Sequence, residues 1–187
     1  MAKKLAYQVL EPFLTQPYEK LHVAGIAQQL REPRQTVSLW LSQLEKTGVL
    51  TKQFQGKLTQ YSLNRKHPLI IDYLVIAEKQ KLVRKCEKEL VLRELVSFIH
   101  MMSKENTKVC FFGSATQSLE RAHDIDLLVV GTIDTEALKN ISQRLNKEIH
   151  LIRVAQLTKI TETLKKEIIK KHLIVQGSEQ IIRWLLW

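Results

Sequence analysis

The sequence predicts an α+β protein in three parts: short helices and a hairpin over residues 1–66, a long helix over 67–104, and a small mixed sheet with helices over 105–187. Three observations support this division. Within the first part, apolar residues recur at helical spacing and then alternate as in strands. From His67 to Ser103 the chain has one proline and no glycine, which favours helix. Beyond Lys108, apolar strands alternate with amphipathic helices.

The first part has the order helix, helix, helix, hairpin. Leu5–Phe13 and Val23–Leu30 carry apolar residues at helical spacing. Pro33 suits the first position of a third helix, Arg34–Thr47, because proline lacks the backbone N–H that this position leaves unused. Gly48 then ends the third helix as a C-terminal cap.

Two alternating strands, Val49–Phe54 and Leu58–Leu63, flank a tight turn at Gln55-Gly56-Lys57, which is typical of a β-hairpin. This order of elements, together with the phrase from Thr36 to Leu50, resembles the winged helix–turn–helix of transcription regulators. The resemblance covers nearly all of residues 1–66. It implies binding to double-stranded DNA, with the third helix as recognition helix and the hairpin as wing.

Polar and basic side chains occupy the outward face of the third helix and the wing. Arginine and glutamine near a helix N-terminus can contact guanine and adenine edges, whereas lysines suit phosphates. The expected base-facing residues are Arg34, Gln35, Ser38 and Ser42, and the expected phosphate-binding residues are Lys46, Lys52 and Lys57. The alternative is a winged helix that contacts another protein, with its charges merely solvating the surface.

Charge is concentrated at the N-terminus. The formal net charge is +10. Residues 1–66 hold ten Lys/Arg against four Asp/Glu, residues 67–104 seven against five, and residues 105–187 twelve against ten. This excess favours a polyanion-binding module in the first part. A lysine-rich thermophile surface would account for the charge but not for its position.

The middle part is predicted to be one amphipathic helix, or two helices in line, with a polar stretch from Glu78 to Lys81. Two roles remain open. The helix is either a spacer whose apolar face packs on the flanking domains, or the interface of a homodimer, because helix–turn–helix proteins usually bind as symmetric pairs. In the second case Leu90 and Leu95 would lie in the interface.

The third part contains the most informative local pattern. An apolar run, Val109–Phe112, ends at Gly113-Ser114, and after a polar connection Asp124 and Asp126 open a second apolar run. Residues i and i+2 of a strand share a face, so the two carboxylates would point together and favour a cation such as Mg²⁺ between them. A Gly-Ser turn offers backbone N–H groups and a hydroxyl to phosphate oxygens. The alternative is a surface turn followed by an ordinary strand.

This stretch resembles the nucleotidyltransferase signature of the DNA polymerase β superfamily, and within it the minimal nucleotidyltransferases. The resemblance runs from about Lys108 to the C-terminus. It implies that Gly113 and Ser114 bind a nucleoside triphosphate and that Asp124 and Asp126 bind Mg²⁺. Winged-helix regulators fused to such a domain are known from archaea.

The sequence departs from this family at the third carboxylate, which active members carry on a later strand. Alternation within that strand places His150 at the expected position. Glu148 shares a face with His150 and could substitute as the catalytic carboxylate. The run after Gly113-Ser114, from Ala115 to His123, also lacks the glycine that is usual in the family, and the connection to Asp124 is about one residue shorter.

The remaining predicted elements are the helices Thr135–Asn146 and Leu157–Lys171, the strands Ile149–Val154 and Leu173–Val175, and a closing helix Glu179–Trp187. Its two tryptophans are expected to be docked or in an interface. Cys86 and Cys110 are expected to be reduced apolar fillers. The sequence has no 18-residue uncharged apolar run and no apolar signal core, which indicates a cytoplasmic protein without a membrane partner.

Two functions from different classes are therefore expected to compete. The first is a DNA-binding transcriptional regulator whose second domain binds a nucleotide with Mg²⁺ and transfers nucleotides slowly or not at all. The second is an active nucleotidyltransferase that transfers a nucleoside monophosphate to a protein, an RNA or a small molecule. A third interpretation, an antitoxin-like protein with a protein partner, rests on fold analogy alone.

Overall fold

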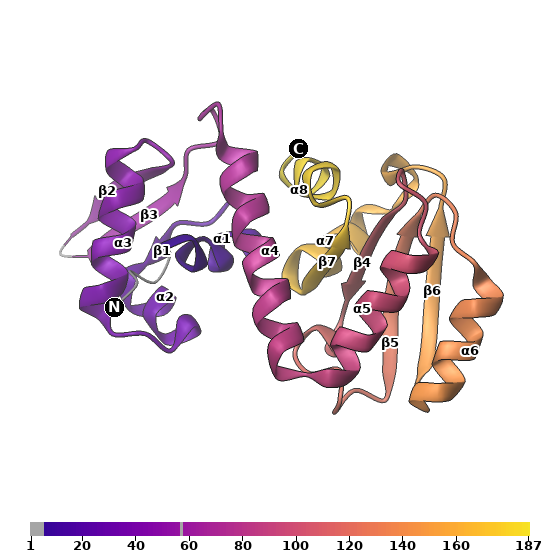
Figure 1. Ribbon diagram of the computed structural model, residues 1–187. Coiled ribbons are helices and arrows are strands. Elements are labelled where there is room, and N and C mark those ends of the chain that lie inside the picture. Colours follow the sequence, from indigo (N-terminus) through magenta and orange to yellow (C-terminus); the bar gives the residue numbers. More distant parts are fainter. Residues whose placement is uncertain (1–5, 57) are drawn as a thin grey trace. The chain divides into compact units, whose positions relative to one another are not determined.

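The structure is a computed structural model that describes residues 6–56 and 58–187. It is an α+β fold of two compact units, Met1–Ala77 and Glu78–Trp187 (Figure 1). Helix α4 (Ile70–Lys88) contributes residues to both units. The predicted middle part, 67–104, is thus divided between the two units.

The first unit combines short helices with a three-stranded sheet of order β1-β3-β2. Its elements are η1 (Ala6–Leu10), α1 (Glu11–Thr15), β1 (Leu21–His22), α2 (Val23–Leu30), α3 (Arg34–Lys46), β2 (Leu50–Gln55), β3 (Leu58–Leu63) and the start of α4. The predicted single helix Leu5–Phe13 is wrong in its described part, because a 3₁₀ turn precedes α1. Pro12 in the first turn of α1 lacks the N–H that a continuous α-helix would need. Leu5 lies outside the described residues.

Helix α3 is defined by its two ends. Pro33 is its N-cap, one residue before the predicted position, and the Pro33 carbonyl accepts the Val37 N–H at 3.1 Å. At the other end, Gly48 has a left-handed φ of 78°. The Gly48 and Val49 N–H groups donate to the carbonyls of Glu45 and Leu44, both at 2.9 Å. This paired pattern satisfies carbonyls that the helix end leaves open, so the predicted stop at Gly48 is confirmed.

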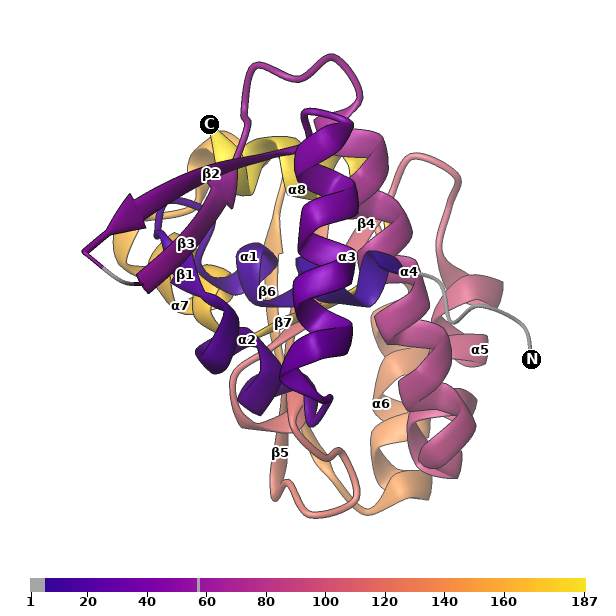
Figure 2. The ribbon, with the colours of Figure 1, turned by 90° about the vertical axis from the view of Figure 1, so that its left-hand side faces the viewer.

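The predicted hairpin is also confirmed. Strands β2 and β3 pair antiparallel from Leu50↔Leu63 to Gln55↔Leu58. Figure 2 gives a second view of this hairpin and of α3. The inward face of α3 consists of four buried residues, Val37, Trp40, Leu41 and Leu44. The opposite side of α3 carries mostly polar residues together with the exposed Leu39.

The second unit is built on a four-stranded sheet of order β6-β5-β4-β7, in which β5 and β6 are parallel and the other pairs antiparallel. Its elements are the end of α4, α5 (Leu90–Met102), β4 (Lys108–Phe112), η2 (Ser114–Thr116), β5 (Asp124–Val130), α6 (Thr135–Leu145), β6 (Glu148–Val154), η3 (Leu157–Lys159), α7 (Glu162–Lys170), β7 (His172–Gln176) and α8 (Ser178–Leu186). The predicted helix Leu157–Lys171 is wrong at its start. Thr161 caps α7 by accepting the Leu164 N–H at 3.3 Å, which separates α7 from the η3 turn.

Helices α5 and α6 cover one face of this sheet (Figure 1). Alternate residues of β5, Ile125, Leu127 and Val129, pack there in one core with Leu95 of α5 and Ile141 of α6. Alternation therefore turns the intervening residues of β5, including both aspartates, to the opposite face. On that face α8 contacts β4 and β7, whereas β6 is an edge strand.

The apolar face of α5 belongs to the core of the second unit. Leu95 is completely buried there, whereas Leu90 at the start of α5 is 63% exposed. Helix α5 is therefore an integral part of the second unit. The C-terminal tryptophans differ from each other: Trp184 is half-buried with Lys165 over its ring, and Trp187 is exposed. Within residues 6–56 and 58–187, no helix combines the length and apolar character needed to span a membrane.

Candidate metal centre and nucleic-acid interface

The parallel pair β5–β6 brings four polar side chains onto one face of the sheet. Asp124 lies opposite Glu148, and Asp126 lies opposite His150. Residues paired across neighbouring strands project to the same side, and so do residues two apart on one strand. The prediction that Asp124 and Asp126 point together is therefore confirmed by the pairing. The strand register also places His150 beside them, at the position where alternation put it.

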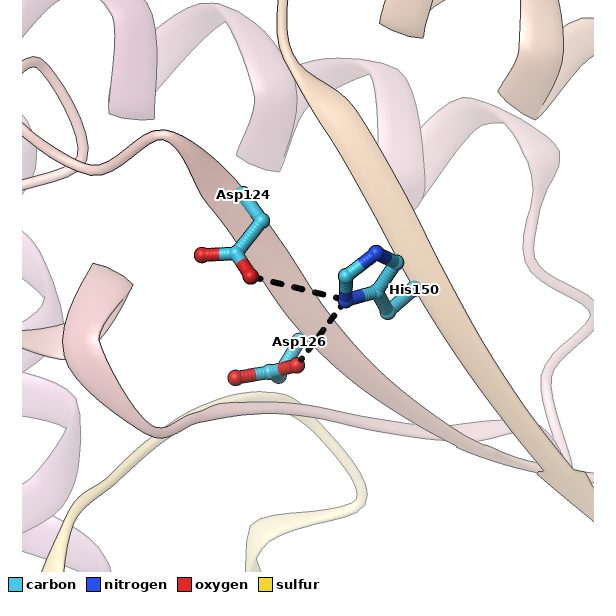
Figure 3. Close-up of side chains that lie close together, drawn as sticks. All are labelled: Asp124, Asp126 and His150. Carbon is cyan, nitrogen blue, oxygen red and sulfur yellow. Dashed lines mark ion pairs between the residues drawn. The ribbon is translucent and has the colours of Figure 1, made fainter.

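Asp124, Asp126 and His150 converge closely (Figure 3). The Nδ1 atom of His150 lies 3.5 Å from Oδ2 of Asp124 and 3.6 Å from Oδ1 of Asp126. All three side chains offer ligand atoms within 4.8 Å of one another. Among the residues that the structure describes, no third Asp or Glu joins this group. Two arrangements satisfy the contacts: a protonated imidazole between the carboxylates, or a neutral imidazole that shares a cation with them.

The Asp126 carboxylate lies against the backbone of Gly113. The backbone of Gly113 has φ 70° and ψ −147°, a conformation that residues with a side chain rarely adopt. A Cβ atom at this position would lie 2.4 Å from Oδ2 of Asp126. The glycine is thus needed for two reasons, its φ and the space that the Asp126 carboxylate occupies. Ser114 follows at the surface, in the η2 turn that contacts β5.

The environment of Asp126 disfavours its negative charge. Burial raises the pKa of this carboxyl first, and the neighbouring Asp124 carboxylate raises it further. His150 acts in the opposite direction but does not cancel the two effects. A cation bound between the carboxylates would oppose both causes of the raised pKa.

Glu148 lies on the outer side of His150. Its Oε1 atom is 3.3 Å from Nε2 of His150, and its side chain is 76% exposed. The two ring nitrogens thus face different partners, Nε2 toward Glu148 and Nδ1 toward the aspartates. The residue expected as a substitute catalytic carboxylate therefore contacts the imidazole rather than the Asp pair.

The polar side of α3 is the second candidate site. Arg34, Gln35 and Ser38 are exposed, and Ser42 is half-buried at the edge of this strip. Residues 34, 38 and 42 are four apart, so they follow one another along a single side of the helix. The structure therefore brings together the four residues that the sequence predicts to face DNA bases.

Two of the three predicted phosphate-binding lysines, Lys46 and Lys52, lie at exposed positions of the first unit. Lys46 is exposed in the last turn of α3. Lys52 is exposed on β2, with its Nζ atom 5.2 Å from the ring centre of Phe54. Lys57 lies outside the described residues. Arg34, Lys46 and Lys52 are thus exposed basic residues of the first unit.

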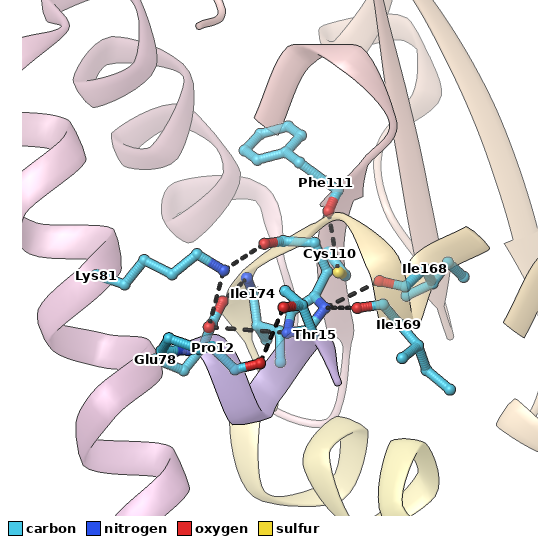
Figure 4. A network of polar contacts seen from close by, with 10 residues as sticks. Pro12, Thr15, Glu78, Lys81, Cys110, Phe111, Ile168, Ile169 and Ile174 are labelled. Carbon is cyan, nitrogen blue, oxygen red and sulfur yellow. Dashed lines mark hydrogen bonds and ion pairs between the residues drawn. The ribbon is translucent and has the colours of Figure 1, made fainter. Parts of the chain in front are cut away.

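Glu78, Lys81, Ile168 and Ile174 of the second unit take part in a network of polar contacts (Figure 4). The Glu78 carboxylate accepts the Ile174 N–H at 2.8 Å and a hydrogen bond from Lys81 at 3.2 Å. Lys81 also donates to the backbone carbonyl of His172 at 2.6 Å. Because Nδ1 of His172 lies 2.9 Å from the Ile168 carbonyl, it carries the proton and donates. Nε2 of His172 then faces Glu78 at 3.8 Å.

The network shifts the pKa values of its members. Burial alone would raise the pKa of Glu78, but Lys81, His172 and the Ile174 N–H together outweigh burial and lower it. Burial and then Lys81 lower the pKa of His172, despite the nearby Glu78 carboxylate. Burial also strongly raises the pKa of the Cys110 thiol, in line with its expected role as a reduced apolar filler.

Sequence reasoning missed this network. The one available signal was the polar stretch from Glu78 to Lys81 that interrupts the apolar pattern of α4. Glu78 and Ile174 are 96 residues apart in the chain, so only the fold reveals that these groups satisfy one another.

Comparisons with known proteins give no further assignment. No protein-family model, no curated protein and no solved structure matches the chain.

Proposed function

We propose that the chain is a DNA-binding transcriptional regulator with a winged helix–turn–helix in its first unit and a nucleotidyltransferase-like second unit. The observation that carries the DNA-binding part is the outward strip of α3, where Arg34, Gln35 and Ser38 are exposed next to an exposed hairpin strand. Side chains of these types can read base edges in the major groove. The wing lysines would then hold the phosphate backbone.

The distribution of charge between the two units supports this proposal less strongly than the distribution of charge along the sequence did. By the units of the structure, Met1–Ala77 has ten Lys/Arg against five Asp/Glu, and Glu78–Trp187 has nineteen against fourteen. Both units are therefore net basic by the same amount. The proposal consequently depends on the chemistry and exposure of the α3 strip rather than on overall charge.

The second unit, on this proposal, binds a nucleoside triphosphate together with a divalent cation and transfers nucleotides weakly or not at all. Asp124 and Asp126 would hold the cation, and the turn at Gly113-Ser114 would approach the phosphates. A bound cation would neutralise phosphate charge in such a complex. The third position near the aspartates is an imidazole, which disfavours efficient transfer through a carboxylate base.

Selection of bound sequences from random duplex DNA, followed by shift assays over a salt series, tests the DNA-binding part. Arg34→Ala and Gln35→Ala should each lose about 1–3 kcal/mol of discrimination at one base pair. Lys52→Ala should weaken binding to all sequences alike and reduce the logarithmic salt slope by about 0.9. These outcomes separate residues that read bases from residues that bind phosphate.

Matched controls come from exposed residues of the second unit. Arg183→Ala, Gln143→Ala and Lys139→Ala remove the same side-chain types at exposed helix positions, so they should leave DNA binding unchanged. If the wild-type protein binds no duplex DNA even at low salt, the proposal is wrong. Equal losses from Lys139→Ala and Lys52→Ala would show that binding is nonspecific attraction to a basic protein.

An active nucleotidyltransferase is the second candidate function. Its support is the close approach of Asp124, Asp126 and the Gly113 turn. Incubation of the protein with radiolabelled nucleoside triphosphates, Mg²⁺ and cell extract would reveal transfer to a protein, an RNA or a small molecule. Asp124→Asn and Asp126→Asn should each abolish such labelling. Transfer that survives both substitutions would place the reaction elsewhere.

A further inference from the structure

We propose that Asp124, Asp126 and His150 form a site that selects a late first-row transition metal, with Zn²⁺ as its reference ion, over Mg²⁺, and that Glu148 positions the His150 ring. This inference rests on the proposal that the site holds a divalent cation, and it names the class of cation. The donors that the chain offers at this site are two carboxylates and one imidazole.

The donor set fits Mg²⁺ poorly. Mg²⁺ prefers oxygen ligands in octahedral geometry, whereas imidazole nitrogen suits Zn²⁺, Cu²⁺, Ni²⁺ and iron. Here one of the three donors is Nδ1 of His150, and it lies at nearly equal distances, 3.5 and 3.6 Å, from one oxygen of each aspartate. His150 Nδ1 is therefore one of the three donors, close to both aspartates.

The spacing of the donors also favours a tetrahedral ion. Ligand atoms about 2.0–2.1 Å from a metal lie about 3.3 Å apart in a tetrahedron and about 2.9 Å apart in an octahedron. The two distances from His150 Nδ1, 3.5 and 3.6 Å, are closer to the tetrahedral value. Asp124, Asp126 and His150 remain partly exposed, which leaves an open side for a further ligand, such as water or a phosphate oxygen.

Glu148 supplies a second observation that points to a metal. Histidines that bind metals usually donate their other ring N–H to a carboxylate, which fixes the tautomer and the ring orientation. Nε2 of His150 lies 3.3 Å from Glu148 Oε1. With the proton on Nε2, Nδ1 presents its lone pair toward Asp124 and Asp126. Glu148, His150 and the two aspartates thus follow one another, along one face of β6 and β5, in the order that a carboxylate–imidazole–metal arrangement would need.

Metal titration of the full-length protein, stripped with a chelator and free of nucleotide and DNA, tests the inference. Zn²⁺ and Mg²⁺ are compared by isothermal titration calorimetry, with a chromophoric chelator as competitor for Zn²⁺. One Zn²⁺ per chain should bind, at least about 100-fold more tightly than Mg²⁺. Asp124→Asn and Asp126→Asn should each remove this binding, whereas His100→Gln, an exposed histidine on α5, should leave it unchanged.

His150→Asp is the decisive variant, because it replaces only the nitrogen donor and creates a set of three carboxylates. Its Zn²⁺ affinity should fall while its Mg²⁺ affinity rises, so the preference narrows by at least about tenfold. Circular dichroism checks that the variant is folded. If His150→Asp leaves the affinities for both ions unchanged, or if His100→Gln lowers Zn²⁺ binding as strongly as Asp124→Asn does, the inference is overturned.

Glu148→Gln tests the positioning role separately. It should weaken Zn²⁺ binding by about 10–100-fold at unchanged stoichiometry, and Glu148→Asp should restore part of the loss. Nitrogen NMR of the His150 ring should show Zn²⁺ on Nδ1 in the wild type and a mixture of tautomers in metal-free Glu148→Gln. An unchanged tautomer in that variant would refute the role of Glu148.

The outcomes also separate this inference from the proposed function. Tight, site-specific Zn²⁺ binding without any binding of nucleoside triphosphate would support the metal site and remove the nucleotide from the proposal. Mg²⁺-dependent nucleotide binding without a preference for Zn²⁺ would do the reverse. Absence of binding of either ion would overturn the inference.

Discussion

Gly113 and Asp126 are fitted to each other: a Cβ atom on Gly113 would lie 2.4 Å from Oδ2 of Asp126. Gly113 directly follows β4, and Asp126 lies on β5 opposite Phe112, the last residue of β4. The contact therefore links the glycine turn to the carboxylate pair through neighbouring strands. It connects the two halves of the pattern that first indicated nucleotide chemistry in the sequence.

Gly113→Ala should both destabilise the second unit and weaken divalent-cation binding. The left-handed backbone conformation alone costs an alanine about 1–3 kcal/mol, and the added methyl group must displace the Asp126 carboxylate. Thermal unfolding measures the first effect, and calorimetric titration with Zn²⁺ measures the second.

Gly25→Ala is the matched control, because a Cβ atom at Gly25 meets nothing within 4 Å. Gly25 lies within α2, where alanine should stabilise the helix by about 0.5–1 kcal/mol. Cation binding that is unchanged in Gly113→Ala would show that Gly113 serves the backbone turn alone.

Glu78→Ala should cost about 3–5 kcal/mol of unfolding free energy, as expected when one partner of a buried ion pair is removed. Lys81 would lose its carboxylate partner, and the Ile174 N–H would lose its acceptor. Glu78→Gln keeps an acceptor for Ile174 and should cost less. Denaturant unfolding followed by circular dichroism provides the comparison.

The surface pair Glu179–Arg183 provides the contrast, since both side chains are more than half exposed. Glu179→Ala should change stability by about 0.5 kcal/mol or less. A loss in Glu78→Ala no larger than that in Glu179→Ala would mean that the buried network contributes little to the fold.

The sequence was most informative where one periodicity, the alternation of side chains along a strand, determines which face a residue occupies. Alternation alone put Asp124, Asp126 and His150 on one face, because a strand has only two faces. It did not supply the register between β5 and β6, which is what places His150 opposite Asp126. That register depends on the packing of two strands with a helix between them, and this information is spread over many side chains.

Short sequence patterns predicted least about residues whose hydrogen-bond partners lie far away in the chain. The glycine stop at Gly48 and the hairpin turn were predictable because a few neighbouring residues determine them. The environment of Glu78, in contrast, could not be predicted from its neighbours in the sequence. Its charge suggests solvent, yet it is completely buried because Lys81 and the Ile174 N–H satisfy its carboxylate.

Stability should fall as the pH falls from about 7 to 5, because of His172. Its folded pKa lies below the ordinary 6.5, so near pH 6 the unfolded chain binds a proton that the folded chain does not. Stability then rises with pH wherever the unfolded state binds more protons, by at most about 1.4 kcal/mol per pH unit for one group. Glu78 acts in the same direction at lower pH, because its pKa is lowered from 4.5.

His172→Asn should flatten the dependence between pH 7 and 5, since an asparagine amide can donate to the Ile168 carbonyl without titrating. Denaturant unfolding at several pH values measures the slope. His123→Asn, at an exposed loop position, serves as control and should retain the wild-type slope. Equal slopes for wild type and His172→Asn would show that His172 is not the group responsible.

Substitution by lysine should affect the fold differently at Leu90 and at Leu95 of α5. Leu95 is completely buried in the core of the second unit, so Leu95→Lys should unfold that unit. Leu90 is 63% exposed, so Leu90→Lys should keep the fold. If the exposed side of α5 forms the predicted homodimer, light scattering should give twice 21.8 kDa for the wild type and 21.8 kDa for Leu90→Lys. A wild-type monomer at micromolar concentration would refute the homodimer, and a dimeric, folded Leu90→Lys would move the interface away from this side of α5.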